Sequence, residues 1–154
     1  MRYILIGLLT ASLILGIKYY NNIASKDVEF DMGNLSIIKQ SGERLDIKLK
    51  IADTINERAK GLMFVKEMPE GEGMLFIFEQ EEMRKMWMEN TYLPLDMLFV
   101  NKDKVIFNFK ENATPLSREI IYSVGPALYV VELNAGFVKK HGIKTGDKIE
   151  FEIE

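Results

Sequence analysis

The stretch "ERLDIKLKIA" (residues 43–52) decides the fold class, because its aliphatic and charged residues alternate one by one. The aliphatic residues at every second position are Leu45, Ile47, Leu49 and Ile51. A period of two places these side chains on one face of an extended chain, so the stretch predicts a β-strand with one buried face. The preceding run "NLSIIKQ" (34–40) is also rich in strand formers, and Ser41-Gly42 between the two runs favours a turn. These two runs therefore predict a β-hairpin.

Short apolar runs separated by turn residues continue this β pattern to the C-terminus. We expect strands at 74–78, 83–91, 95–100, 105–111, 120–123 and 128–136, and a hairpin-like segment at 143–153. Two short helices interrupt them. The first is predicted to run from the capping-box pair Thr54 and Glu57 to Gly61, and the second covers 135–142. This spacing predicts a mainly β fold over residues 35–154, a single compact antiparallel β-sandwich or partly open barrel.

Residues 1–20 differ from the rest of the chain, since positions 3–17 carry no charge. This pattern is typical of a signal peptide or a signal anchor. Counted to Tyr20, with Lys18 reaching the membrane surface, the predicted hydrophobic helix is just long enough to cross a bilayer. No Ala-x-Ala sequence follows it. We expect an uncleaved membrane anchor, a tether at 21–34 and a domain outside the cytoplasm, with secretion after signal cleavage as the alternative.

Composition excludes several kinds of site. The chain is 47% hydrophobic and 28% charged, which indicates a folded domain. It has no cysteine, so disulfides, thiol nucleophiles and cysteine-ligated metals are excluded. The first twenty residues hold two basic residues and no acidic one, so the rest carries 18 basic and 23 acidic residues, a net charge of −5. Because phosphate binding needs clustered basic residues, we expect no nucleic-acid partner. No cofactor is predicted.

The run "MWMENTYLPLDMLFV" (86–100) carries polar residues where an ordinary buried strand would have none. If its first part is a strand, Met88 and Asn90 lie on one face and Trp87 lies on the other. A buried indole N–H needs an acceptor, which Asn90 or Asp96 could supply. The run is therefore either a wall of a binding site or an edge strand followed by a turn.

Two further residues extend this candidate site. Asp96 begins a predicted core strand, where a buried carboxylate needs a donor, and Arg58 is suited to a charge-assisted pair with it. Glu132 interrupts an otherwise apolar strand end. Three readings stay open: a polar site for a ligand, a catalytic pair with Asp96 and Glu132 as acid and base, or a buried network that only stabilises the fold.

A copper site is a weaker alternative. Met83, Met86 and Met88 are soft donors around the single tryptophan. Methionine also fills irregular cores, and the single histidine, His141, lies far away beside a helix-ending glycine. We therefore predict no metal site.

Four segments occur together in the order and spacing of one known family. They are "ERAKGLMFVKEMPEGEGMLFIF" (57–78), "WMENTYLPLDMLFV" (87–100), "ENATPLS" (111–117) and "VGPALYVVELNAGFVKKHGIKTGDKI" (124–149). Over about residues 53–151 the chain resembles the domain of unknown function 192 family. The characteristic positions of that family, as they occur here, are Arg58, Gly61, Met63, Gly73, Met74, Trp87, Met88, Asn90, Thr91, Pro94, Asp96, Glu132, Asn134, Gly136, Gly146 and Asp147.

The resemblance implies a small bacterial or archaeal protein, often with a signal or anchor, whose compact domain is mainly β and has no established activity. Met86 departs from the family pattern, which usually has an aromatic residue there. The residues that we expect to bind are Arg58, Trp87, Met88, Asn90, Thr91, Asp96 and Glu132. We predict a non-catalytic module that binds a small ligand or an envelope protein, with an envelope-acting hydrolase and a purely structural network as alternatives.

Overall fold

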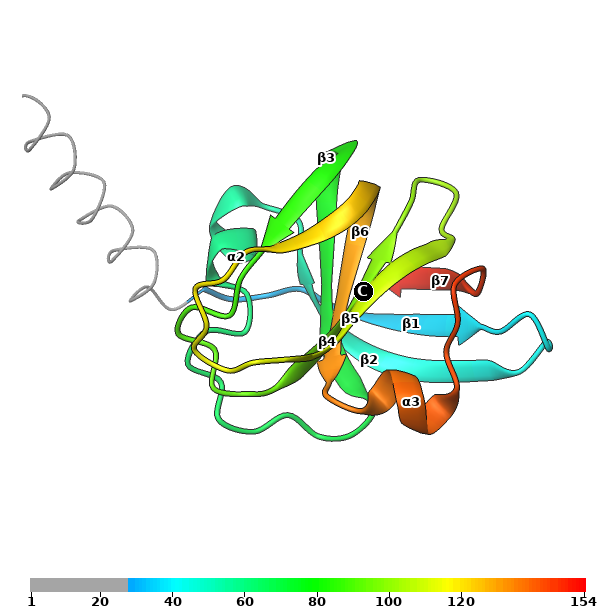
Figure 1. Ribbon diagram of the computed structural model, residues 1–154, viewed down its shortest axis with the longest axis horizontal. Coiled ribbons are helices and arrows are strands. Elements are labelled where there is room, and N and C mark those ends of the chain that lie inside the picture. The colour runs from blue at the N-terminus through cyan, green and yellow to red at the C-terminus, as the bar shows by residue number, and fades with distance from the viewer. Residues whose placement is uncertain (1–27) are drawn as a thin grey trace, which may run out of the picture.

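The structure, a computed structural model, describes residues 28–154 (Figure 1). The segment predicted as a membrane anchor or signal peptide, residues 1–20, and the first half of the predicted tether, 21–27, lie outside the described residues. Within 28–154, no helix is both long enough and apolar enough to cross a membrane.

The described residues form seven strands and two short helices. The strands are β1 (Met32–Ile38), β2 (Arg44–Ala52), β3 (Glu72–Met86), β4 (Leu95–Val100), β5 (Ile106–Ala113), β6 (Ile121–Asn134) and β7 (Lys148–Ile153). The helices are α2 (Ile55–Lys60) and α3 (Phe137–His141). Strand β1 begins at Met32, inside the range that the sequence assigned to the tether.

The strands form one curled sheet in the order β5-β4-β6-β3-β2-β1-β7, which Figure 1 shows as a half-barrel. Its two edges approach each other at one end, where Val105 bridges Lys148. Beside that bridge, the backbone N–H of Ile106 donates to the carbonyl of Asp147 at 2.8 Å. The mainly β prediction is thus confirmed, in the form of one curled sheet with two short helices.

The sequence predicts an antiparallel sheet, but one pair of neighbouring strands is parallel. Strands β2 and β3 pair in parallel, with Leu49 beside Gly73. A parallel neighbour requires a crossover connection, which α2 and residues 61–71 supply. The predicted hairpin at 143–153 is also wrong, because only β7 is a strand there and it pairs with β1. The predicted β1–β2 hairpin is confirmed.

Strands β3 and β6 are each longer than the sequence predicted. Each joins two predicted strands, β3 through polar residues (79–82) and β6 through Val-Gly-Pro-Ala (124–127). A register shift between Ile77 and Glu82 accommodates the irregular part of β3. Residues 124–127, which the sequence placed between two predicted strands, lie inside β6, where Pro126 is opposite Met83 next to a second register shift. Proline is tolerated there because a bulge does not require its missing N–H.

Alternation along the strands divides the core into two parts. The inner core fills the half-barrel and includes Leu35, Ile47, Leu49, Leu75, Leu98, Val131, Leu133 and Val138. The outer core covers the other face of β3, β4 and β6 and includes Leu62, Met74, Phe76, Met88, Met97, Phe99 and Val130. All six residues of β4 are buried because its two faces belong to different cores. This explains why "LDMLFV" lacks the alternation of a half-exposed strand.

Helix α2 has the predicted ends. The Thr54 hydroxyl accepts a hydrogen bond from the Glu57 N–H at 3.2 Å, and the Glu57 carboxylate accepts one from the Thr54 N–H at 2.9 Å. This reciprocal pair is a capping box, and Gly61 ends the helix with φ 47°. Helix α3 ends at Gly142, so both predicted helices are confirmed.

Candidate functional site

The strand register places Asp96 and Glu132 on opposite faces of the sheet. Across β4 and β6, Asp96 lies beside Leu133 and Glu132 lies beside Met97. Because successive side chains of a strand point to opposite faces, Asp96 shares the inner face with Leu133 and Glu132 shares the outer face with Met97. The two carboxyls do not face a common site. The predicted acid–base pair is therefore not formed.

Asp96 holds the backbone of two other elements. Its side chain is completely buried, and its two carboxylate oxygens accept hydrogen bonds from the N–H groups of Asn112 and Val138, each at 2.9 Å. Val138 lies in the first turn of α3, whose N-cap residue Gly136 has no side chain to satisfy such a donor. The predicted pair between Arg58 and Asp96 is wrong, because both oxygens of Asp96 are engaged with backbone on the inner face.

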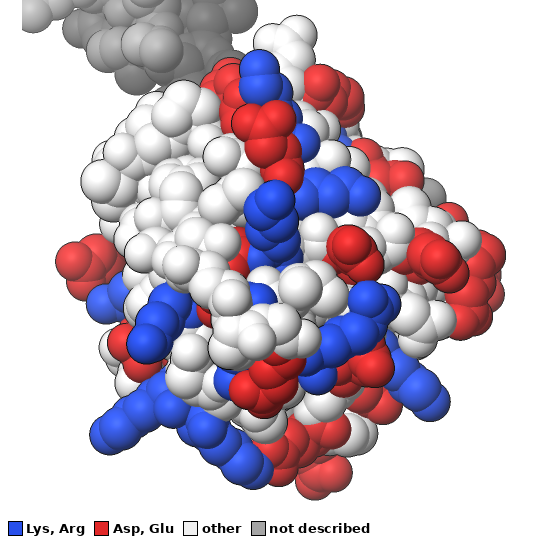
Figure 2. Space-filling model, turned by 90° about the vertical axis from the view of Figure 1, so that its right-hand side faces the viewer, with Lys and Arg blue, Asp and Glu red and all other residues white. Residues whose placement is uncertain are grey.

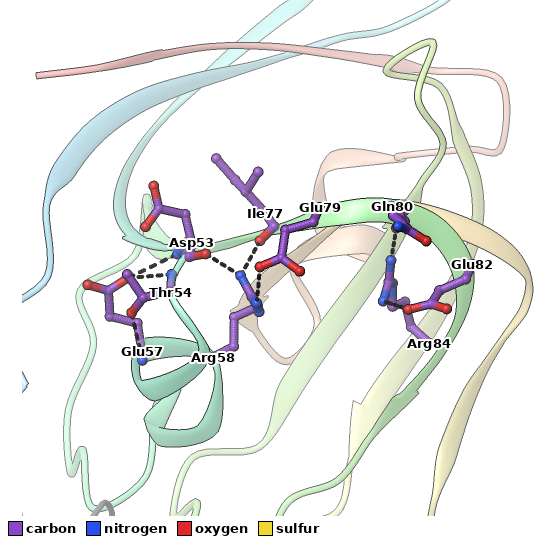
Figure 3. Close-up of polar contacts among 9 residues, drawn as sticks. All are labelled: Asp53, Thr54, Glu57, Arg58, Ile77, Glu79, Gln80, Glu82 and Arg84. Carbon is purple, nitrogen blue, oxygen red and sulfur yellow. Dashed lines mark hydrogen bonds and ion pairs between the residues drawn. The ribbon is translucent and has the colours of Figure 1, made fainter.

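Arg58 instead connects α2 to β3 (Figure 3). Its guanidinium donates to the backbone carbonyl of Asp53, to the carbonyl of Ile77 at 2.9 Å, and to the Glu79 carboxylate at 3.1 Å. It also lies 5.3 Å from the ring centroid of Phe78. These contacts leave 13% of its side chain exposed. Arg58 therefore fixes the helix against the irregular part of β3.

Replacing Arg58 with alanine is expected to lower the free energy of unfolding by about 2 kcal/mol, because the part-buried Ile77 carbonyl and the Asp53 carbonyl lose a charged donor. Equilibrium urea denaturation measures this loss. The matched control is Arg44→Ala, since Arg44 is half exposed and pairs only with surface carboxylates. Its expected cost is below about 1 kcal/mol. Equal effects of the two substitutions would contradict the assigned role of Arg58.

The segment after β3 differs from its prediction as a strand. Strand β3 ends at Met86, so the proposed division of faces over 86–90 is wrong. Trp87 is 43% exposed, whereas Met88 is fully buried in the outer core. Asn90 has a left-handed backbone with φ 56°. The chain therefore turns here, and the turn leaves the indole at the surface.

A pocket of about 130 Å³ lies on the outer face of the sheet, between β3 and the segments 58–63 and 85–91. The predicted site residues that line it are Arg58, Trp87, Thr91 and Glu132. The predicted site residues outside it are Met88, Asn90 and Asp96. Its apolar walls include Leu62, Met63, Phe76, Phe78 and Met86. The volume suits a few heavy atoms rather than a large cofactor.

Glu132 is the unusual member of this pocket. It is 4% exposed, and its neighbours across the two adjacent strands are Met74 and Met97. Among residues 28–154, no group donates a hydrogen bond to its carboxyl. Burial alone raises the pKa of Glu132 to about 8, so the carboxyl is mostly protonated at neutral pH. Because Glu132 lines the pocket, its side chain borders the space that a ligand could occupy.

Sequence reasoning missed two aromatic residues of the pocket and a buried arginine that contacts one of them. Phe76 and Phe78 alternate along β3 with inner-face residues, and reading "MLFIF" with a period of two would have placed them together. Arg84 is 8% exposed, and its guanidinium carbon lies 3.8 Å from the Phe78 ring centroid. Figure 3 shows its contacts with Gln80 and Glu82. Its Nε donates to the Ala127 carbonyl at 2.9 Å, and burial lowers its pKa. No sequence signal marks Arg84, which looks like a surface residue.

Other characteristic positions stabilise the fold. A side chain at Gly73 would place its Cβ 2.4 Å from the backbone oxygen of Glu132, so only glycine fits between β3 and β6. The side-chain amide of Asn134 donates to the Met68 carbonyl at 2.9 Å. The carboxylate of Asp147 accepts from two backbone N–H groups. A role in stabilising the fold therefore explains several characteristic positions of the family. It does not explain Glu132.

The fold and the pocket define a small half-barrel domain with a buried, unpaired carboxyl beneath one outer surface. The model of the family domain of unknown function 192, described as "Uncharacterized ACR", matches residues 36–151, and the chain belongs to this family. The resemblance seen from residue 53 onward is confirmed, and the match extends back through the first hairpin.

Two solved structures are similar to this chain. One, from Sinorhizobium meliloti 1021, is described as a "putative transcription regulator" and is 42% identical, covering 82% of this chain and 98% of that chain with a TM-score of 0.79. The other, a protein of unknown function from Novosphingobium aromaticivorans DSM 12444, is 34% identical, covering 84% of this chain and 96% of that chain with a TM-score of 0.75. Comparison with curated proteins gave no match.

Proposed function

We propose that the domain is a non-catalytic binding module whose outer pocket holds a small ligand or one side chain of an envelope protein. The observation that carries the proposal is the Glu132 side chain, which is buried, has no hydrogen-bond donor among residues 28–154 and lines an open pocket. A fold gains nothing from burying a lone carboxyl, because desolvation disfavours it and no internal hydrogen bond offsets the cost. A ligand that completes the hydrogen bonding gives this residue a role.

The pocket also has the general composition of a binding site. Its lining combines aromatic and aliphatic side chains with charged and polar ones. Trp87 contributes a partly exposed ring to it. The hydrolase alternative loses its main support, because Asp96 is engaged on the inner face and cannot act together with Glu132.

The setting of the domain belongs to the same proposal. Residues 1–20 have the pattern of a membrane anchor, which supports a domain held outside the cytoplasm, or secreted if the segment is cleaved. The relative from S. meliloti carries a regulatory description. Direct contact with nucleic acid is not part of our proposal, since basic and acidic side chains are interspersed on the face in Figure 2 and residues 21–154 are net negative.

Trp87 is the single tryptophan of the chain and lines the pocket, so its fluorescence can report on binding. The test is a titration of the full-length protein with small organic compounds of several classes, combined with thermal unfolding. A compound at about a hundred times its Kd should stabilise the protein by about 2.7 kcal/mol. We expect hits that change the fluorescence of Trp87 and raise Tm.

A variant that fills the pocket is the control for this test. Ala59 lines the pocket from α2, so Ala59→Phe should obstruct it without touching Glu132. Ser41→Phe, in the exposed β1–β2 turn, adds the same ring elsewhere. Binding lost in Ala59→Phe and kept in Ser41→Phe supports the proposal. Equal binding by both variants, or no binding by any compound class, contradicts it.

A further inference from the structure

Three connected loops hold large apolar side chains at the surface of the domain. Phe64, Tyr92 and Leu116 are 43%, 44% and 57% exposed. The rings of Phe64 and Tyr92 meet edge to face, with their centroids 6.2 Å apart. The N–H of Leu116 donates to the carbonyl of Thr91 at 3.0 Å, which joins the third loop to the second. We call Phe64, Tyr92 and Leu116 the loop surface.

The backbone holds two of these side chains in an unfavourable conformation. Phe64 and Leu116 have φ angles of 66° and 60°, in the left-handed region that bulky side chains rarely adopt. Asn90 is also left-handed, with φ 56°, and its carbonyl accepts a hydrogen bond from the Phe64 N–H at 2.9 Å. Strain of this kind persists where the surrounding structure enforces it, and it gathers at functional sites. A loop without a function could use glycine here at lower cost.

The chain enters the domain close to the loop surface. Phe30 packs against the outer core, as do Val65 and Leu93, the residues that follow the two aromatic residues of the loop surface. Figure 1 shows the blue start of the described chain on the same side of the sheet as α2. Seven residues, 21–27, separate the described chain from the end of the predicted anchor. Even fully extended, this connection spans less than about 30 Å.

We propose that the loop surface docks onto the lipid bilayer in which the chain is anchored, with its three side chains at the level of the headgroups. This inference goes beyond the outer pocket and rests on the predicted membrane anchor. Tyrosine suits such a position, because its ring is apolar and its hydroxyl stays in water. Lys60, whose ammonium lies 4.8 Å from the Phe64 ring centroid, and the exposed Lys66 can reach the headgroups from apolar stems.

The anchor makes so small a surface sufficient. Three side chains would not hold a free protein on a bilayer, because their burial barely offsets the lost freedom of the whole molecule. A domain held within about 30 Å of the bilayer has already lost that freedom, so docking becomes an intramolecular step. Glu67 and Glu119 adjoin Lys66 and Arg118 in the sequence, so the loops do not depend on anionic lipid. We therefore expect docking to neutral phosphatidylcholine.

The test measures how deeply the loop surface enters the bilayer. The chain has no cysteine, so one introduced cysteine can carry a nitroxide spin label. Leu116→Cys places the label in the loop surface, and Ser41→Cys places it in the β1–β2 turn, at the opposite end of the domain in Figure 1. Full-length protein is reconstituted in phosphatidylcholine vesicles. Power saturation then compares collisions of the label with O₂, which concentrates in lipid, and with a water-soluble nickel chelate.

We expect the ratio of O₂ to nickel accessibility at position 116 to exceed that at position 41 by about threefold or more. Adding Tyr92→Asp should lower the ratio at position 116 toward that at position 41, because a carboxylate resists transfer into the bilayer. Tyr122→Asp is the matched control, since Tyr122 is 52% exposed and lies outside the loop surface. It should leave the ratio unchanged, and thermal unfolding verifies that both variants fold.

Each other outcome overturns the inference. A ratio at position 116 no higher than at position 41, in protein that resists extraction by alkaline carbonate, shows an anchor without docking. Low accessibility to both reagents at position 116 shows that protein, such as a second copy of this chain, covers the loop surface. Extraction of the protein by carbonate removes the anchor and the inference together. Ligand binding that is lost in Ala59→Phe does not depend on these results, so the proposed function can hold where docking fails.

Discussion

A Glu132→Gln variant is expected to be more stable than wild type at pH 8, by about 4 kcal/mol. The folded-state pKa of Glu132 is about 8, well above the ordinary value of 4.5. Above pH 4.5 the unfolded carboxyl ionises while the folded one stays protonated, so the unfolded state binds fewer protons and wild-type stability falls as the pH rises to about 8. Each unit of pKa difference corresponds to about 1.4 kcal/mol. Glutamine cannot ionise and removes this loss.

The measurement is equilibrium denaturation of both proteins at about pH 4.5 and pH 8. We expect the two proteins to differ little at the lower pH and strongly at the higher one. Glu111→Gln is the control, since Glu111 is an exposed residue of β5. A wild-type stability that does not change between these pH values would show that Glu132 is solvated or paired in the folded protein. A stabilising substitution at a binding residue is the usual sign that function opposes stability there.

Asp96→Ala is expected to lower the free energy of unfolding by about 3–5 kcal/mol. The carboxylate accepts two backbone hydrogen bonds in a completely buried position, and each charge-assisted bond contributes about 1.5–3 kcal/mol. Its removal leaves the N–H groups of Asn112 and Val138 without their acceptor. Denaturation at neutral pH measures the loss, and amide hydrogen exchange at Val138 should accelerate because α3 loses its cap.

Two further variants serve as controls for Asp96→Ala. Asp103→Ala removes an exposed aspartate whose carboxylate has no hydrogen-bond partner within residues 28–154, and it should cost less than about 0.5 kcal/mol. Asp96→Asn keeps one acceptor oxygen but directs an amide N–H toward a backbone donor, so its cost should be intermediate. If Asp96→Ala abolished ligand binding without reducing stability, Asp96 would be a functional residue after all.

Local signals in the sequence predicted local structure correctly. Thr54, Glu57 and Gly61 lie within one short segment, so the limits of α2 follow from neighbouring residues alone. The β1–β2 hairpin follows from two alternating runs around a turn. The family was also evident from ordered motifs. In each case the information lies within a few residues of the structure that it determines.

Relations between distant strands could not be predicted in this way. Whether Asp96 and Glu132 meet depends on the register of β4 against β6, and a shift of one residue would reverse which face each occupies. The parallel β2–β3 pair depends on the path of the connection through α2 and residues 61–71. No local sequence signal predicts this path. Trp87 was predicted to lie in a strand at 83–91, but β3 ends at Met86, so Trp87 lines the pocket from the segment that follows the strand. The candidate site was therefore only half predicted.

The meeting of the two sheet edges affects how copies of the protein behave at high concentration. An unpaired edge strand offers free N–H and C=O groups to another chain and can begin aggregation. Here β5 and β7 are joined at one end by the Val105–Lys148 bridge, which shortens both free edges. The rest of these strands exposes charged residues, among them Lys110, Glu111 and Glu150. Such edges oppose intermolecular strand pairing, so the half-barrel can stay open without becoming a template for fibres.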